Sequence, residues 1–595
     1  MAKIKLSDYI AKFLLKNNIH HVFAITGGAS LHLIHSVENL DGISLVCPHH
    51  EQAAAMAAEA YSRSTGNIGC AMATSGPGAT NLITGICSAY YDSIPVLYLT
   101  GQVSTFRLKR DTGVRQFGFQ ETETVQICKP VTKYAKMIED PSRIRYELEK
   151  AIYIAKEGRP GPVLLDVPDN LQREMIDEDS LEGFLPDEND SNNEELERQV
   201  QLVINLLRKS KRPVAIFGAG IRLSGGQEKS VTLAKKLNIP ILPTWGAIEL
   251  LPSDQVVGTF GLHGTRYGNF AIQNADLVIS IGSRLDTHET GSPISSFARG
   301  AKKVIVDIDP FELKKFPAFG MEVDISVLSD AKKFIECFLA VAEKEKFPDF
   351  SEWHGRIDDW KSRFSICPDI YLESSSVNPY VFVRKLSQLL PSDATIAIDT
   401  GCAVAWFMQA FEAKKGQHIF SSLNNTPMGY ALPAAIGASI ALGKKQVICL
   451  SGDGGIQMNI QELATIMHHE LPIKIIVINN GGYSMIQQTQ DQWLDSNYVG
   501  SSKQGGLSFP NFGLLAEAHC INSFKINKSN DLEQTLKEFL KSEGPALLDL
   551  VVDSKERVVP QVVFGRPIED AGPLLDRETF LKQMIVEPLD VSKEL

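Results

Sequence analysis

The chain has 595 residues, 44% of them hydrophobic and 22% charged, which is typical of a soluble globular protein long enough for three or four domains. The formal net charge of −12 excludes the basic surface that nucleic acid or an acidic membrane would require, and the longest weakly polar run, 431–443, is too short to span a bilayer. Nine cysteines without a paired short spacing, and an N-terminus without a signal-peptide core, lead us to expect a cytoplasmic protein.

Residues 1–184 are predicted to form a first parallel α/β domain, because short apolar runs alternate with helical stretches. A strongly helical segment begins near Pro48-His-His-Glu51 and continues to Tyr61. Taken alone, Glu51 is a first-turn acid that favours the helix dipole. Several glycines in this domain either serve ordinary turns or let the backbone approach a ligand closely. They are Gly27, Gly28, Gly76 and Gly78.

The acidic and polar segment 187–193 is predicted to be a linker, and a second α/β domain follows at 198–345. Its first apolar run leads into Gly218-Ala-Gly220. This is a weak dinucleotide-binding signal, because the third glycine of the usual pattern is absent. A second linker is predicted at 346–379, where prolines and a serine triplet occur.

The third α/β domain is predicted at 380–552 and is followed by a C-terminal tail at 553–595. Its most informative segment is an apolar run that leads into a glycine-rich turn, after which a helical pattern begins. The turn consists of Gly452, Asp453, Gly454 and Gly455. Because backbone N–H groups and the start of the helix point at one spot, the turn suits an anionic group such as a diphosphate.

Asp453 adds a carboxylate oxygen to this turn. A second apolar run ends at Asn479-Asn480, so an amide oxygen arrives from the neighbouring strand end. Carboxylate, amide and diphosphate oxygens together favour an octahedral Mg²⁺ site. The alternative is an ordinary βαβ unit with a tight glycine turn and an asparagine pair in a loop.

The spacing from Gly452 to Asn480 resembles the signature of thiamin diphosphate enzymes. Segments along nearly the whole chain also resemble, in the same order, those of the acetohydroxyacid (acetolactate) synthase family. The segments are 23–30, 50–52, 74–78, 119–121 and 424–435 for thiamin diphosphate, and 260–265, 282–286 and 306–310 for FAD. The resemblance implies three parallel-sheet α/β domains: pyrimidine-binding, central FAD-type and diphosphate-binding.

The family pattern assigns thiamin diphosphate and Mg²⁺ to the first and third domains. It implies that Glu51 hydrogen-bonds N1′ of the aminopyrimidine, and that Gln120 contacts the substrate, with Gly28 in the same catalytic set. Met428, otherwise a core methionine, would bend the cofactor. The implied metal ligands are Asp453, Asn480 and the backbone carbonyl of Gly482. The implied cofactor-binding residues are Gly76, Met428, Gly452, Gly454, Gly455 and Met485.

The resemblance also implies that the central domain binds FAD, which has no redox role in the family's main reaction and would be structural here. Arg284 would lie by the flavin phosphates and Asp307 by the adenosine end. The implied FAD-binding residues are Gly218, Gly220, Gly264, Thr265, Arg284, Asp286 and Asp307.

Several positions depart from the family pattern. Thr489 stands where branched-chain acetohydroxyacid synthases carry a tryptophan that shapes preference for the second 2-oxo acid. Asp169 stands where a lysine is typical, and 401–403 lacks the usual Gln-His diphosphate contacts. The stretch 483–490 and the segment 565–570 resemble a branch encoded with surface-polysaccharide genes. The yersiniose-forming member of that branch adds a two-carbon unit from pyruvate to a nucleotide-linked 4-keto sugar.

The resemblance therefore implies a carboligase that decarboxylates pyruvate and transfers the two-carbon unit to a second pyruvate or to a ketone such as a keto sugar. In this family the cofactor lies between the first domain of one subunit and the third of another, so we expect a homodimer or homotetramer. Two alternatives remain open. One is a 2-oxo acid decarboxylase or flavin-dependent pyruvate oxidase; the other is a nucleotide-binding protein without thiamin chemistry, based on Gly218-Ala-Gly220 alone.

Overall fold

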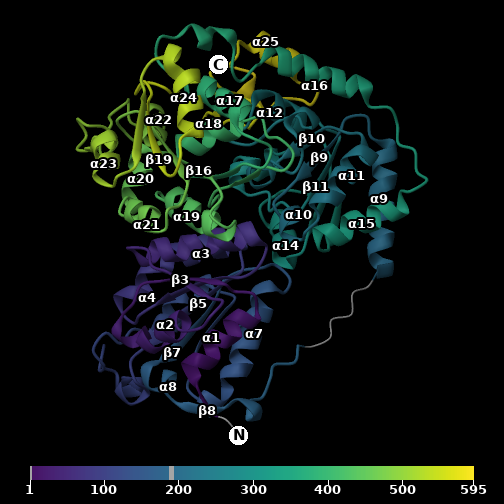
Figure 1. Ribbon diagram of the computed structural model, residues 1–595. Coiled ribbons are helices and arrows are strands. Elements are labelled where there is room, and N and C mark those ends of the chain that lie inside the picture. The colour runs from purple at the N-terminus through teal and green to yellow at the C-terminus, as the bar shows by residue number, and fades with distance from the viewer. Residues whose placement is uncertain (1–2, 187–192, 595) are drawn as a thin grey trace.

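The computed structural model describes residues 3–186 and 193–594 (Figure 1). The predicted linker at 187–193 therefore lies outside the described residues, except for Asn193, which begins helix α9 (Asn193–Lys209). Among the described residues, no helix is both long and apolar enough to cross a membrane. Figure 1 shows three α/β units: purple and blue at the bottom, teal at the right, and green to yellow at the upper left.

The first unit is built on a six-stranded parallel sheet. Its central strands are buried along their whole length, as expected for a parallel sheet covered by helices on both faces. The strand order is β3 (Ser44–Val46), β2 (His21–Ala24), β4 (Gly69–Ala73), β5 (Val96–Gln102), β7 (Val163–Pro168) and β6 (Tyr134–Met137).

The central unit has a five-stranded parallel sheet. The strand order is β10 (Ile241–Pro243), β9 (Pro213–Phe217), β11 (Leu277–Ile281), β12 (Lys302–Asp307) and β13 (Ile325–Leu328). The order reverses between β9 and β11, and ligands bind in the crevice at the carboxyl ends of strands flanking such a reversal. The loops that leave these two strands begin at Gly218 and Gly282.

The third unit has a second six-stranded parallel sheet, so the predicted architecture of three parallel-sheet α/β domains is confirmed. The strand order is β15 (His418–Phe420), β14 (Thr395–Ile398), β16 (Val447–Gly452), β17 (Ile473–Asn479), β19 (Ala546–Val551) and β18 (Asn522–Ile526). Its order reverses between β14 and β16, which places Asp399 and Asp453 at the same edge.

The first and third units pack together through helices α3 (Glu51–Thr65) and α19 (Ala431–Ala441), which lie side by side in Figure 1. Both helices are rich in alanine, which lets their backbones approach closely. A Cβ placed on Gly437 would lie 2.0 Å from the carbonyl oxygen of Ala57. The two units therefore share one continuous hydrophobic core.

Two segments without a predicted fold of their own are ordered against the central unit. The segment predicted as a second linker contains helix α16 (Ser351–Arg363), whose Trp353 and Trp360 are buried in the core of that unit. The predicted tail contains helix α25 (Arg577–Gln583), and the side chain of Phe580 joins the same core. Both segments therefore complete the central unit.

Candidate active site

The structure brings the predicted metal ligands together at the ends of two adjacent strands. β16 ends at Gly452, which pairs with Ile478 of β17, so Asp453 follows one strand and Asn480 the other. Four backbone N–H groups hold the Asp453 carboxylate at 2.7–3.2 Å. They belong to Gly454, Asn480, Gly481 and Gly482.

Three oxygen atoms can face one another at this point. When the amide oxygen of Asn480 is turned inward, it lies 3.3 Å from Oδ2 of Asp453 and 2.7 Å from the carbonyl oxygen of Gly482. Without a cation the opposite amide orientation is preferred, because the nitrogen then donates to both oxygens. Mg²⁺ holds oxygens at about 2.0–2.1 Å in an octahedron, so its neighbouring ligands lie about 3 Å apart. The residues present therefore fit Mg²⁺.

This site contains one carboxylate and two neutral oxygens. Accordingly, no group of three or more His, Cys, Asp or Glu side chains placed to hold a metal occurs within 3–186 and 193–594. Burial raises the pKa of Asp453 to about 6, although the surrounding backbone N–H groups act in the opposite direction. A bound cation would favour the ionised carboxylate.

The glycines of the turn differ in the space around them. A Cβ on Gly454 would lie 2.1 Å from Cε1 of Tyr483, and a Cβ on Gly455 would lie 2.8 Å from Oδ2 of Asp399. A Cβ on Gly452 would meet nothing within 4 Å. Gly454 and Gly455 therefore permit close packing of the turn, whereas Gly452 borders open space.

Asp399 is a buried carboxylate that the sequence analysis missed. It follows β14 and accepts hydrogen bonds from Oγ of Ser451 at 2.7 Å and from the backbone N–H of Gly429 at 3.0 Å. Burial raises the pKa of this carboxyl to about 6. Asp399 therefore connects the end of the third sheet to the segment that contains Met428. The available signal was an aspartate directly after an apolar run, at the sheet edge where ligands bind.

Glu51 is the first residue of α3, and the ring of His50 caps this helix by accepting the N–H of Gln52 at 3.0 Å. Oε2 of Glu51 accepts an N–H of the Asn81 side chain at 2.9 Å. A Cβ on Gly78 would lie 3.2 Å from Oε1. The half-buried carboxyl group therefore lies against the turn that follows β4.

Gln120, Gly76 and Gly28 lie on loops beside this first sheet. Gln120 is exposed and adopts a φ of 64°, and a Cβ on Gly76 would lie 3.2 Å from that of Gln120, so their loops touch. Glu121 shapes the Gln120 loop, because its carboxylate accepts three backbone N–H groups at 2.6–3.1 Å. Burial acts to raise the pKa of Glu121, but these N–H groups lower it below its usual range. A Cβ on Gly28 would meet nothing within 4 Å.

A cavity of about 840 Å³ lies where the central unit meets the first and third units. Its volume and its place at the reversal of strand order suit a dinucleotide. The predicted FAD-binding residues that line it are Gly220, Arg284, Asp286 and Asp307. Met485, which was predicted beside thiamin diphosphate, also lines this cavity from helix α22 (Ser484–Trp493).

Three other predicted FAD-binding residues lie behind the cavity wall. A Cβ on Gly218 would lie 2.2 Å from the carbonyl oxygen of Gly282, and one on Gly264 would lie 2.4 Å from backbone atoms of the preceding turn. Thr265 caps the start of helix α12 (Arg266–Gln273). These residues shape the wall and do not line the cavity.

A cluster of three rings that the sequence analysis missed lines one part of the cavity. Nδ1 of His263 lies 3.0 Å from Nε2 of His288, and the ring of Trp245 packs on His288 with centroids 4.4 Å apart. Burial lowers the pKa of His263 to about 3, so this ring is neutral. Nε2 of His263 and Nε1 of Trp245 are buried without a partner among the described residues. Both nitrogens are therefore available to a ligand.

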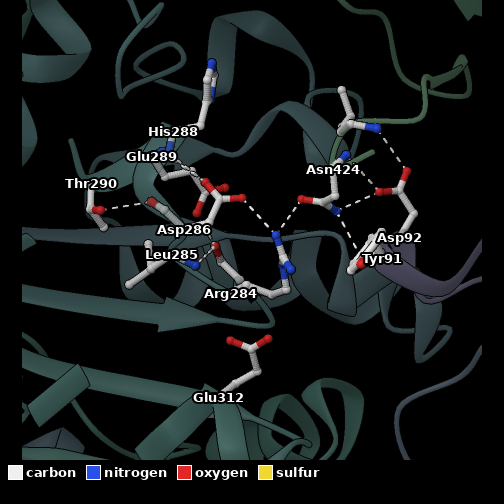
Figure 2. Close-up of polar contacts among 12 residues, drawn as sticks. Tyr91, Asp92, Arg284, Leu285, Asp286, His288, Glu289, Thr290, Glu312 and Asn424 are labelled. Atoms are coloured by element: carbon white, nitrogen blue, oxygen red, sulfur yellow. Dashed lines mark hydrogen bonds and ion pairs between the residues drawn. The ribbon is translucent and has the colours of Figure 1, made fainter. Parts of the chain in front are cut away.

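Two charged residues stand at other parts of the same wall. Burial raises the pKa of Asp307, at the end of β12, to about 6. Figure 2 shows Arg284 between Asp286 and Asn424, to which its Nη2 donates at 2.9 and 2.6 Å. The cavity therefore offers a carboxylate, a guanidinium and unpaired ring nitrogens, a donor set that fits the ribose, phosphates and ring system of FAD.

Comparison with known proteins gives matches along most of the chain. The chain matches three domain families of thiamine pyrophosphate enzymes. They are the N-terminal TPP binding domain at residues 4–127, the central domain at 200–338 and the C-terminal TPP binding domain at 399–550. The acetolactate synthase large subunit of Porphyra purpurea is 35% identical over 569 residues, covering 93% of this chain and 92% of that protein.

Two further relatives match over a similar length of the chain. Chloroplastic acetolactate synthase 2 of Zea mays is 33% identical over 580 residues, covering 95% of this chain and 88% of that protein. The acetolactate synthase large subunit of Lactococcus lactis subsp. lactis (strain IL1403) is 34% identical over 579 residues, covering 95% of this chain and 96% of that protein.

Proposed function

Because the chain belongs to the acetolactate synthase family of thiamin diphosphate enzymes, we propose that it transfers the two-carbon unit of pyruvate to a ketone larger than pyruvate, such as a nucleotide-linked keto sugar. Membership makes the chain a carboligase that uses thiamin diphosphate and Mg²⁺. It also removes the alternative of a nucleotide-binding protein without thiamin chemistry.

The proposal gives each cluster of the site a role. When bound, thiamin diphosphate supplies the electron sink that lets a 2-oxo acid lose CO₂. Asp453, Asn480 and the Gly482 carbonyl would hold the Mg²⁺ ion that anchors its diphosphate. Glu51 would hold a proton at N1′ of the aminopyrimidine, and Gln120 would orient the substrate.

The choice of acceptor rests on Thr489. Its Oγ1 donates to the carbonyl oxygen of Met485 at 3.2 Å, so this small side chain folds back along α22. Nothing bulky projects from the position where branched-chain acetohydroxyacid synthases carry a tryptophan. The part of the active site that receives the acceptor would therefore be wider and could admit a larger ketone. The second candidate acceptor is another pyruvate, which the printed names of the relatives support.

Comparing two acceptors in the wild-type protein and a Thr489→Trp variant tests this choice. We expect CO₂ release from pyruvate to be slow alone and to accelerate with a nucleotide-linked keto sugar. The tryptophan should lower turnover of the larger ketone by at least about tenfold while sparing turnover with pyruvate alone, because it fills only the acceptor side. Rapid acetolactate formation from pyruvate alone, unaffected by the ketone, would instead assign the second pyruvate as acceptor.

We further propose FAD for the 840 Å³ cavity, with Arg284 at its phosphates and Asp307 at its adenosine end. The unpaired nitrogens of His263 and Trp245 support a ring system at the part of the cavity that they line. Removal of bound flavin from the purified protein without loss of activity or stability would contradict a structural role for FAD.

The active site is proposed to form between two copies of the chain. The loop that carries Gln120 exposes Phe106, Phe117 and Phe119, with relative exposures of 69%, 68% and 85%. Large aromatic side chains in such numbers on one loop indicate a surface that another chain covers. This exposed aromatic surface favours a homodimer or homotetramer.

Co-expression of two defective copies tests the shared site. One copy carries Glu51→Gln and the other Asp453→Asn. If each site combines Glu51 of one chain with Asp453 of another, random pairing should restore about one quarter of wild-type activity, because half of the dimers contain one intact site of two. Co-expression of two Glu51→Gln copies is the control and should stay inactive. Absence of recovery in a confirmed mixed dimer would place both residues in one chain's site.

A further inference from the structure

A series of hydrogen bonds connects the cavity of about 840 Å³ with the first and third units (Figure 2). Because FAD is proposed to bind there, we call it the dinucleotide cavity. Nη2 of Arg284, from the central unit, donates to Oδ1 of Asn424, from the third unit, at 2.6 Å. Nδ2 of Asn424 then donates to Oδ1 of Asp92, from the first unit, at 2.6 Å, and to the carbonyl oxygen of Tyr91 at 3.2 Å. Asn424 is therefore the residue at which the three units meet.

Asp92 extends this series into the first unit. Its side chain is only 4% exposed, and Oδ2 accepts an N–H of Arg63 at 2.6 Å. Arg63 lies on α3, the helix that begins with Glu51, and also donates to buried Glu59 at 2.7 Å. The hydrogen bonds thus reach the helix proposed to hold the aminopyrimidine ring.

The same carboxylate organises the third unit. The backbone N–H groups of Leu423 and Asn424 donate to Asp92, each at 3.0 Å. Met428, proposed to bend thiamin diphosphate, follows four residues later, and the hydroxyl of Tyr430 donates to Glu59 at 2.5 Å. The segment 423–430 is therefore held at both ends by side chains of the first unit.

Arg284 has hydrogen-bond donors that remain free to bind a ligand. Its two contacts with Asp286 and Asn424 both use Nη2, and among the described residues no acceptor takes Nε or Nη1. A guanidinium is planar and presents its donors in a fixed arrangement, so a phosphate oxygen at Nη1 would leave the bond from Nη2 to Asn424 in place. A bound dinucleotide would thereby fix Arg284, and through it Asn424.

We propose that Asn424 is a positioning residue through which an occupied dinucleotide cavity orders the thiamin diphosphate site. The proposal rests on the FAD site proposed above. Dinucleotide binding fixes Arg284, and the fixed guanidinium holds Asn424, Asp92 and the segment leading to Met428. Thiamin diphosphate then meets a site that is already ordered and binds more tightly. Coupling between two binding sites is reciprocal, so thiamin diphosphate must tighten FAD by the same factor.

Binding titrations on flavin-depleted and FAD-reloaded protein test the coupling without any turnover. The Kd of thiamin diphosphate, measured with Mg²⁺ by calorimetry, should be about tenfold lower in the FAD-loaded wild-type protein. The Asn424→Ala variant should bring the ratio of the two Kd values to about 1. Asn424→Asp, which keeps a partner for Arg284 but replaces the amide donor facing Asp92, should do the same. Asn205→Ala, at an exposed position of helix α9 outside this segment, is the control and should retain the wild-type ratio.

The outcomes separate this inference from the proposed function. FAD that binds, together with a tenfold ratio that disappears only in the Asn424 variants, supports the positioning role. If FAD binds but the ratio of the two thiamin diphosphate Kd values is the same in the wild type and in both Asn424 variants, the positioning role is overturned and the flavin site stands. A wild-type protein that binds thiamin diphosphate but no FAD overturns the flavin site and this inference together.

Discussion

Replacing Glu51 with glutamine is expected to lower pyruvate turnover by about 10²–10⁴-fold, the usual contribution of a positioned acid or base. The glutamine amide keeps the size and the hydrogen-bonding reach of the carboxyl group, so contact with Asn81 can persist. What it loses is the capacity to hold and release a proton at the aminopyrimidine ring. Thiamin diphosphate should therefore still bind, because its diphosphate is held elsewhere.

The experiment compares steady-state CO₂ release with thiamin diphosphate binding in the same preparation. Glu38→Gln, at the exposed end of helix α2 (Leu31–Glu38), makes the same chemical change on the surface of the first unit and should leave both quantities unchanged. Turnover of the Glu51→Gln protein within a few-fold of wild type would remove Glu51 from the proton-transfer role. A parallel loss of thiamin diphosphate binding would show that Glu51 contributes to the affinity for the cofactor instead.

Replacing Asp453 with asparagine is expected to abolish Mg²⁺-dependent binding of thiamin diphosphate and, with it, measurable turnover. The substitution removes the one anionic ligand of the proposed site and leaves only neutral oxygens, which hold Mg²⁺ poorly. The fold should tolerate the change. Burial raises the pKa of Asp453, so a neutral side chain relieves the cost of a buried charge. The amide nitrogen of asparagine cannot accept the backbone N–H that one carboxylate oxygen accepts, which acts in the opposite direction.

Because these two effects oppose each other, thermal unfolding without cofactors should give a melting temperature for Asp453→Asn within a few degrees of that of the wild-type protein. Adding Mg²⁺ and thiamin diphosphate together should raise the melting temperature of the wild type but not of the variant. Asp393→Asn, on an exposed turn, is the control and should respond like the wild type. A cofactor-dependent rise in the variant equal to that of the wild type would exclude Asp453 as a metal ligand.

The arrangement around Asp453 could be predicted from local sequence patterns. Two apolar runs joined through a helix predict adjacent parallel strands, and parallel strands place their carboxyl ends together. The glycine turn after β16 and the asparagine pair after β17 must then meet, and the structure shows that they do. The neighbouring residues of Glu51 did not by themselves predict a catalytic role, because a glutamate in the first turn of a helix is common. Only the family pattern assigned that role.

Features that depend on packing between units were beyond the sequence. Asn424, Arg284 and Asp92 lie in different units, and nothing in their own segments indicates that they touch. By contrast, helix α16 could have been found in the predicted linker. Trp353, Ile357 and Trp360 recur at helical spacing, and all three are buried. The prolines and serines in the same segment are typical of a linker and favour the opposite interpretation.

The carbon product formed from labelled pyruvate tests the central claim most directly. The protein is incubated with Mg²⁺, thiamin diphosphate, pyruvate carrying ¹³C at its carbonyl and methyl carbons, and a ketone acceptor, and the product is examined by NMR. We predict release of the carboxyl carbon as CO₂ and a new carbon–carbon bond between the labelled carbonyl carbon and the acceptor carbonyl carbon. Labelled acetaldehyde, or labelled acetate with peroxide, in place of that bond would make the protein a decarboxylase or an oxidase and contradict the account.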